Sequence, residues 1–130
     1  MVRAIYAKGA AQHLNPVPNA AVHRGVLVTS GVLGKDPETG DYAPVTADQI
    51  RLAFDQLPGI LAAGGAELQD VVKVDLYFAD RRDREQANEH WEQLWPDPLQ
   101  RPARQAHQVD LPGACRFQLV AMAVLGSGDR

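Results

Sequence analysis

The 130-residue sequence contains one cysteine, Cys115, and few histidines, none of them placed like metal ligands. One thiol excludes an internal disulfide and a multi-cysteine metal site. No two histidines match the pair of an H-E-x-x-H motif, so we expect neither a metal nor another cofactor. Cys115 has no apparent helix start or basic partner to activate it, and we do not expect it to act as a nucleophile. The histidines are His13, His23, His90 and His107.

Long hydrophobic runs are absent as well. The longest uninterrupted run, residues 119–125, is much shorter than the ~20 residues that a membrane-spanning helix needs. Arg3 and Lys8 lie inside the stretch that would have to be the apolar part of a signal peptide. We therefore expect a cytoplasmic protein without a membrane partner. Residues 126–130 are expected to form a short frayed tail.

Positive charge is in deficit, because 13 Lys and Arg residues face 16 Asp and Glu residues and the net charge is −3. Such a chain has no basic field with which to hold a nucleic-acid backbone, so no nucleic-acid partner is expected. The arginines of residues 81–84 are interleaved with acidic residues and are interpreted as a solvated helix start. The hydrophobic share of 45% is typical of a soluble globular protein. The length predicts one domain, residues 1–130.

The N-terminal part carries the alternation and the turn signals of β-structure. Residues 3–7, 20–24 and 26–30 are predicted strands, and Gly25 predicts a tight hairpin between the last two. Residues 35–40 (Lys-Asp-Pro-Glu-Thr-Gly) form a predicted turn, in which proline presets φ and glycine adopts a positive φ.

Two amphipathic helices follow. The first is predicted to begin with a capping box at residues 46–49 and to end at Gly64, with residues 58–59 (Pro-Gly) causing a kink or a frayed second half. The second is predicted to be capped by Asp80 or Asp83. Apolar residues at helical spacing are expected to be buried: Ile50, Phe54, Leu57 and Leu61 in the first helix, and Ala87, Trp91, Leu94 and Trp95 in the second.

Three further strands are predicted at residues 72–78, 104–110 and 117–124. The order β-β-β-α-β-α-β-β is that of an α+β domain. The last strand is apolar on both faces, so we expect it at the centre of the sheet. Two helices can cover only one face of such a sheet, and a second copy of the chain is the simplest cover for the other face.

Several short motifs occur along the chain, one after another. They are Asn15-Pro-Val-Pro-Asn-Ala-Ala, Val28-Thr-Ser-Gly31, Asp36-Pro-Glu-Thr-Gly40, Gln49 to Leu52, Asp70-Val-Val-Lys73, Asn88 and Arg101-Pro-Ala-Arg104. In order and spacing they resemble the Rid family, the YjgF-like reactive-intermediate deaminases that are also called endoribonuclease L-PSP domains. The resemblance covers nearly the whole chain, with single-residue gaps near Pro98 and near Asp110.

This resemblance implies a chorismate-mutase-like α+β fold and a homotrimer. In such trimers the sheets pack into a central barrel, with three clefts between neighbouring subunits. The deaminating members hold the carboxylate of a 2-imino acid with an arginine, while a glutamate handles the water and the proton. The products are a 2-oxo acid and ammonia, so a small carboxylate metabolite is the implied partner.

Three residues match the family site and three depart from it. Arg104 matches the carboxylate-binding arginine, and Ser30 and Asn88 match polar residues near the cleft. In contrast, Val17 occupies the position of a tyrosine in the family, Ala106 that of a cysteine and Gln118 that of the catalytic glutamate. Because a neutral amide can position water but cannot take its proton, the resemblance implies an intact anion-binding half and an incomplete proton-transfer half.

For four residues, plainer roles stay open. Arg104 is either the ligand arginine or an ion-pair partner, and Gln118 either orients a water or ligand or is a satisfied polar residue in a buried strand. Asp110, which strand alternation would place on the face of Arg104, is a substitute base or a neighbour of the following turn. His107 alternates to the opposite face and is expected to be a surface or interface residue.

Three functions remain at this point. The chain is a weak or altered imine or enamine deaminase, and thus a hydrolase, or a trimer that binds a small carboxylate without turning it over. The ribonuclease or translation-inhibitor activity that the L-PSP label implies is disfavoured by the acidic charge balance.

Overall fold

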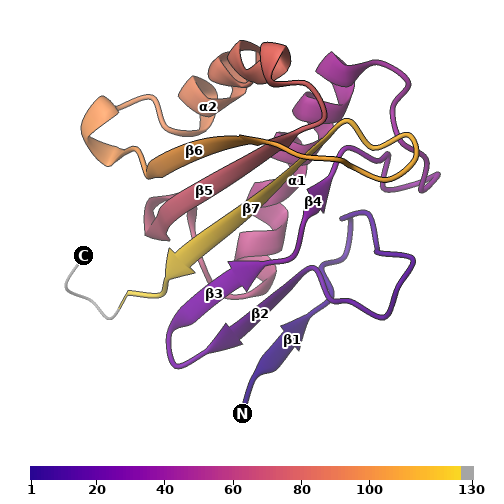
Figure 1. Cartoon of the computed structure of the whole chain (residues 1–130). Coiled ribbons are helices and arrows are strands. Elements are labelled where there is room, and N and C mark those ends of the chain that lie inside the picture. The colour runs from indigo at the N-terminus through magenta and orange to yellow at the C-terminus, as the bar shows by residue number, and fades with distance from the viewer. Residues whose placement is uncertain (127–130) are drawn as a thin grey trace.

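The chain forms one mixed sheet with two α-helices, and the computed structural model describes residues 1–126 (Figure 1). Residues 127–130, most of the expected frayed tail, lie outside the described part. The strands are β1 (Arg3–Ile5), β2 (Ala20–His23), β3 (Val26–Thr29), β4 (Val32–Leu33), β5 (Val71–Phe78), β6 (Ala103–Gln108) and β7 (Phe117–Val124). The helices are α1 (Thr46–Ala63) and α2 (Asn88–Leu94), with shorter 3₁₀ segments η1 (Leu68–Asp70), η2 (Arg81–Ala87) and η3 (Pro98–Gln100).

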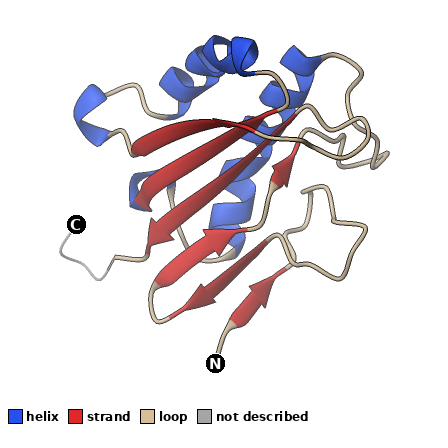
Figure 2. Cartoon of the chain, viewed as in Figure 1, coloured by secondary structure: helices blue, strands red, loops and turns tan. Residues whose placement is uncertain are grey.

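Strand β7 lies inside the sheet, whose order is β1-β2-β3-β7-β5-β6, and the two-residue β4 also pairs with β7. The predicted central position of residues 117–124 is therefore confirmed. The α+β class is confirmed as well, with β4 as an element that the sequence did not predict because it has only two residues. Strands β5 and β6 pair in parallel, and the other pairings are antiparallel. Figure 2 shows both helices on one side of the sheet.

The β2–β3 hairpin forms as predicted. Its two turn residues, Arg24 and Gly25, have φ values of 49° and 79°. Two consecutive positive φ angles are the signature of the two-residue turn whose twist matches that of a hairpin. The expected turn at residues 35–40 also forms, since the Gly40 amide donates to the Asp36 carbonyl at 2.8 Å and Gly40 has a φ of 77°.

The predicted capping box of α1 is wrong. The N-cap residue is Val45, which offers no side-chain acceptor, and Thr46 is the first helical residue. Gln49 turns inward instead: its Nε2 donates to the carbonyls of Ala43 and Ala114, and its Oε1 accepts from the Arg116 amide at 2.7 Å. The buried amide thus joins two loops that are far apart in sequence, which local spacing could not reveal.

The second half of α1 is not frayed, although Pro58 lies within it. Ile60 and Leu61 are fully buried beyond the proline, and this packing holds the last turn in place. The helix ends at Gly64 as predicted, and the next residue, Gly65, has a φ of 86°. Glycine tolerates this left-handed conformation without the steric cost that a side chain would add.

The second helical region begins at Asp80, whose carboxylate accepts from the Arg82 amide at 2.9 Å. One of the two predicted caps is therefore confirmed, but the capped segment is the 3₁₀ helix η2, and α2 follows only at Asn88. Trp91 and Trp95 are buried against each other, with ring centroids 4.9 Å apart. They belong to the core, as the helical spacing predicted.

Two strands differ from their predicted bounds. A register shift between Val71 and Lys73 turns Val71 into the core and leaves Val72 44% exposed, so the predicted alternation from Val72 is wrong at its first residue. Strand β6 ends at Gln108, so the backbone at Asp110 no longer follows strand alternation. The predicted placement of Asp110 on the face of Arg104 therefore does not apply.

The sheet face that the helices leave open carries apolar side chains. In the single chain they are 38–47% exposed, and they come from β3, β5 and β7: Val26, Val28, Val72, Met122 and Val124. The expectation of a second apolar face without a cover in one chain is confirmed. Among the described residues, no helix has the length and apolar character to cross a bilayer.

Candidate functional site

Arg104 lies on β6, at the edge of the sheet, and its guanidinium is half-buried. The guanidinium carbon stands 5.2 Å from the centre of the Trp91 ring, and Nη2 donates to the Arg84 carbonyl at 3.3 Å. Burial lowers the pKa of Arg104, yet a guanidinium stays protonated at neutral pH. Within residues 1–126 it forms no ion pair with a carboxylate. Arg104 is thus a fixed cation with hydrogen-bonding capacity left for an anion.

Two further site residues of the sequence analysis lie near this arginine. Ala106 is two residues along β6 and lines a pocket of about 280 Å³ together with Phe78, Arg81, Arg84, His107 and Gln108. Asn88 is the first residue of α2, one helical turn before the Trp91 ring that supports Arg104, and it is exposed. Arg104, Ala106 and Asn88 are called the edge group below.

Gln118 lies on β7, opposite Leu33 of β4 and Tyr77 of β5. Its amide packs against Gly31: a Cβ placed on that glycine would lie 2.7 Å from Oε1 of Gln118. Ser30, the residue before Gly31, donates its amide to the Asn19 carbonyl at 2.9 Å. Ser30 and Gln118 are therefore brought together by the β4–β7 pairing, and we call these two residues the central group.

The two groups occupy opposite faces of the sheet. Arg104 pairs with Val74 of β5, whereas Gln118 pairs with Tyr77, and these two β5 residues point to opposite faces because their separation is odd. Val74 is buried under the helices, so Arg104 belongs to the helix side and Gln118 to the open side. One chain alone cannot place both side chains around one small ligand.

The remaining candidates lie outside both groups. Val17 is an exposed loop residue before β2, and Asp110 is exposed in the loop after β6. Cys115 is buried, and its thiol donates to the Phe117 carbonyl at 3.5 Å. That thiol also contacts Tyr42, whose pKa is raised by burial first and by the hydrogen bond to Cys115 second. A buried, hydrogen-bonded thiol has a structural role.

His107 lies on the open side, as alternation predicted, and it has a partner there that sequence reasoning missed. Its Nε2 lies 2.9 Å from Oδ1 of Asp75, and its ring stacks on Tyr77 with centroids 4.8 Å apart. The hydrogen bond to His107, more than the nearby Lys73, lowers the pKa of Asp75. Strand alternation places both residues on one face, but only the parallel β5–β6 register brings them together.

His13 is a second residue that the sequence analysis did not place near the site. Burial lowers its pKa most, the charge of Lys35 lowers it further, and a hydrogen bond to the backbone of Gly31 opposes them. The imidazole is therefore neutral at pH 7, beside the glycine that also contacts Gln118. The loop before β2 has to fold back onto β4 to make this contact, and no sequence spacing encodes it.

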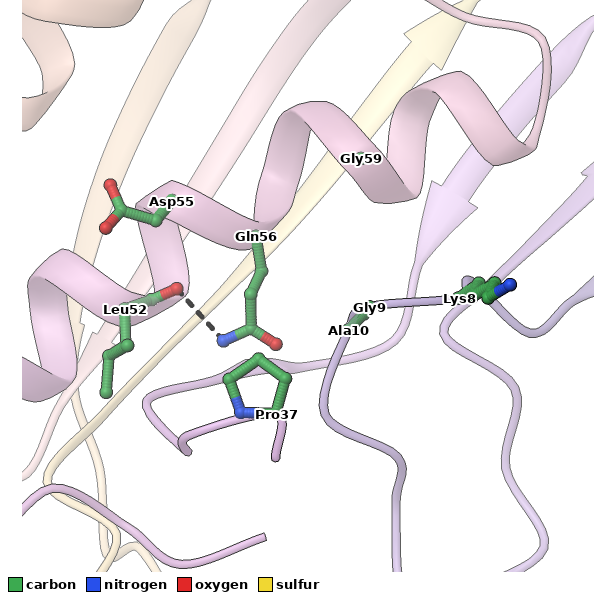
Figure 3. Close-up of a pocket in the computed structure, with 8 residues that line it drawn as sticks. All are labelled: Lys8, Gly9, Ala10, Pro37, Leu52, Asp55, Gln56 and Gly59. Atoms are coloured by element: carbon green, nitrogen blue, oxygen red, sulfur yellow. Dashed lines mark hydrogen bonds between the residues drawn. The ribbon is translucent and has the colours of Figure 1, made fainter. Parts of the chain in front are cut away.

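A pocket between α1, residues 8–10 and Pro37 does not involve either group (Figure 3). Gln56 reaches into it, but all of its polar atoms are used: Oε1 accepts from the Ala11 amide, and Nε2 donates to the carbonyls of Leu33, Lys35 and Leu52. The amide therefore joins the N-terminal loop to α1 and β4, and both of its polar atoms have partners within the chain. No cluster of potential metal ligands occurs in the described residues.

The comparison with known families decides what this fold is. Residues 9–125 match the family described as Endoribonuclease L-PSP. The chain belongs to this family, which includes the Rid proteins. The predicted chorismate-mutase-like α+β fold is confirmed by a solved endoribonuclease-type protein of Thermotoga maritima, with a TM-score of 0.88 and 30% identity over 98% of this chain and 100% of that one.

Relatives within the Rid family extend the comparison. The chain is 35% identical to the 2-iminobutanoate/2-iminopropanoate deaminase of Rattus norvegicus, over 85% of both chains. It is 33% identical to the chloroplastic Reactive Intermediate Deaminase A of Arabidopsis thaliana, over 86% of this chain. In the second comparison it spans only 60% of the relative's length.

Proposed function

We propose that this Rid-family protein binds small carboxylates in clefts between the subunits of a homotrimer and slowly hydrolyses 2-imino acids there. The observation that carries the proposal is Arg104, a half-buried guanidinium that stacks on Trp91 and has no carboxylate partner within residues 1–126. A planar guanidinium suits the two oxygens of a carboxylate. A relative that is 35% identical carries the name of an imino-acid deaminase.

The reaction converts R–C(=NH)–COO⁻ and water into R–CO–COO⁻ and ammonia. The water oxygen bonds to the imine carbon, its protons pass to the nitrogen, and the C–N bond then breaks to release ammonia. Arg104 holds the carboxylate throughout. Gln118 orients the water through its amide oxygen, but it cannot accept a proton, so proton transfer passes through water and the rate is low.

Two features of the single chain support the proposed homotrimer. The edge group and the central group face opposite sides of the sheet, so they meet only where two copies place different faces against each other. The open face carries five partly exposed apolar side chains, which a neighbouring copy would cover. Ser30 and Gln118 of one subunit then face Arg104, Asn88 and Ala106 of the next, and Val17 approaches the same cleft.

A second candidate function is binding without turnover. Gln118 favours it, because the position that resembles the catalytic glutamate holds a neutral amide. Ribonuclease activity is a weaker candidate, since the net charge of −3 gives the chain little affinity for a polyanion.

The test couples a serine or threonine dehydratase, which releases 2-imino acids, to the detection of ammonia and 2-oxo acid. We expect weak deamination above the uncatalysed rate, together with calorimetric binding of 2-oxobutanoate. Binding without any deamination supports the second candidate, and absence of both overturns the proposal. Light scattering should return about 42 kDa, three times 14.1 kDa, and a stable monomer would contradict the shared cleft.

A further inference from the structure

Two arginines of η2 point toward the edge group. In a 3₁₀ helix, side chains three residues apart lie directly above one another, because one turn holds three residues. Arg81 and Arg84 have this spacing. Arg82 between them forms a 2.6 Å ion pair with Asp80, and it borders a neighbouring hollow with both arginines but does not line the pocket that contains Ala106. The backbone amide of Arg81 donates to Oε1 of Gln108 at 3.0 Å, which fixes the start of η2 against β6.

Both arginines line the pocket that contains Ala106. The pocket runs along the free edge of β6, so residues from both faces of that strand reach it, and Figure 1 shows the chain before α2 beside this edge. It adjoins the carboxylate anchor, since Arg104 donates to the Arg84 carbonyl. Two guanidinium groups thus line one concave surface, and a third, that of Arg104, contacts the backbone of the segment that carries them.

These charges are not neutralised by the described chain. Neither Arg81 nor Arg84 forms an ion pair within residues 1–126. Three carboxylates lie nearby. Asp80 pairs with Arg82, Asp83 accepts from Gln86, and Glu85 borders a hollow with both arginines without forming an ion pair within residues 1–126. Guanidinium groups that share a pocket repel one another, and an anion with more than one acidic group removes that repulsion.

We propose that the natural ligand of this cleft carries a second acidic group, a carboxylate or a phosphate, which Arg81 and Arg84 hold while Arg104 holds the first carboxylate. The inference rests on the proposed function, because it takes Arg104 as the first anchor. It adds the substrate class: a small acid with two anionic ends, rather than the short monocarboxylates. A pocket of about 280 Å³ fits a metabolite and not a polymer.

The test compares three acids by calorimetry at low salt: 2-oxobutanoate with one carboxylate, 2-oxoglutarate with two, and 3-phosphoglycerate with a carboxylate and a phosphate. We expect at least one of the two-ended acids to bind about 10-fold more tightly than 2-oxobutanoate. Arg81→Gln and Arg84→Gln should each weaken the binding of that two-ended acid by about 3- to 10-fold and leave the affinity for 2-oxobutanoate unchanged. Arg82→Gln is the matched control, because it removes the same charge from the same helix, and Arg82 is paired with Asp80 and does not line the pocket that contains Ala106.

The outcomes separate this inference from the proposed function. Failure of 2-oxobutanoate to bind, or its unchanged binding to Arg104→Ala, contradicts the proposed anchor. Equal affinity for all three acids overturns the inference of a second acidic group and leaves the proposed function standing. An equal loss of affinity for the two-ended acid in Arg82→Gln also overturns it, because the effect would then come from the general positive charge of the segment. If Arg81→Gln or Arg84→Gln dissociates the oligomer while the preference among acids persists, the arginines are interface residues and the inference is wrong.

Discussion

The edge group and the central group differ in what their side chains can do. At the edge, Arg104 is fixed against Trp91 and the Arg84 carbonyl, carries a permanent charge and forms no ion pair within residues 1–126. At the centre, Gln118 is neutral and packs closely against Gly31. The edge group keeps the chemistry that recognises an anion, whereas the central group lacks a side chain that can exchange protons at the position of Gln118.

Under the proposed function, this difference separates carboxylate binding from turnover within the cleft between two subunits. The binding half needs a charge held in place, and a strand edge that packs against an aromatic ring provides it. The catalytic half needs a group whose pKa lies near the working pH, and an amide has none. The two halves should therefore respond independently to substitution.

The largest effect is expected from Arg104→Ala. Removing a charge-assisted hydrogen bond costs about 1.5–3 kcal/mol, which corresponds to about 10- to 100-fold weaker binding of 2-oxobutanoate. Calorimetry of this variant beside Arg51→Ala provides the comparison, because Arg51 is an exposed residue of α1 that pairs with Asp48 and Asp55 and is not part of the edge group. Unchanged affinity in Arg104→Ala would show that the anion is held elsewhere.

The next effect is a gain. Gln118→Glu introduces an acid–base group where the family resemblance implies one, and it should raise deamination by about 10-fold or more. The gain is limited because Val17 and Ala106 also depart from the family pattern. Burial would raise the pKa of the new carboxyl and Arg104 would lower it, so the gain should depend on pH. The coupled dehydratase assay measures it. Wild-type deamination as fast as that of a glutamate-bearing relative would refute the incomplete site.

A smaller effect tests whether the two groups meet between subunits. The double variant Arg104→Ala, Gln118→Glu has no anchor, and the wild type has no acid–base residue at position 118. In mixed trimers, Arg104 of a wild-type subunit can face the substituted position of its neighbour. We expect deamination a few-fold above that of either protein alone after the two are unfolded and refolded together. Activity equal to the average of the separate proteins would place both groups in one chain.

The smallest effect concerns His13 and the free energy of unfolding. Its folded-state pKa is lowered from 6.5, chiefly by burial, so the unfolded state binds more protons as the pH falls below that value. Acid therefore removes stability through this residue, and the loss is absent above pH 6.5. His13→Asn should flatten the fall in Tm on acidification, and the exposed His23→Asn serves as the control. An unchanged slope would contradict the buried neutral imidazole.

Much of the fold could be read from local patterns. The hairpin at Gly25, the buried stripe of α1 and the central strand β7 each follow from a periodicity or a turn residue that acts within a few positions. The predictions that failed depended on distant contacts. Gln49 left the capping box to join two loops, and the register shift at Val71 and Lys73 exchanged one valine for another in the core.

Candidate site residues could be named from the sequence, whereas their arrangement could not. Resemblance to the Rid family pointed to Arg104, Ser30, Asn88 and Gln118 as the residues to inspect. Nothing local indicated that they would divide between two sheet faces, since that division follows from the pairing of β5 with both β6 and β7. The arginines of η2 were interpreted as a solvated helix start, and they are exposed at the start of that segment. The sequence did not show that two of them also line a pocket with Ala106.

The sequence by itself determined the α+β class and the apolar faces, because residue type and spacing within an element specify these features. The assignment of Arg104 to an anion and of Gln118 to the position of the glutamate came from the family resemblance and stays a prediction. Only the tertiary structure decided which side of the sheet each residue occupies, and that His13 and Gln118 both adjoin Gly31. It also decided that Arg81 and Arg84 share a pocket with Ala106. Each of these depends on strand register or on a loop that folds back, and such contacts are set by packing between segments that are distant in sequence.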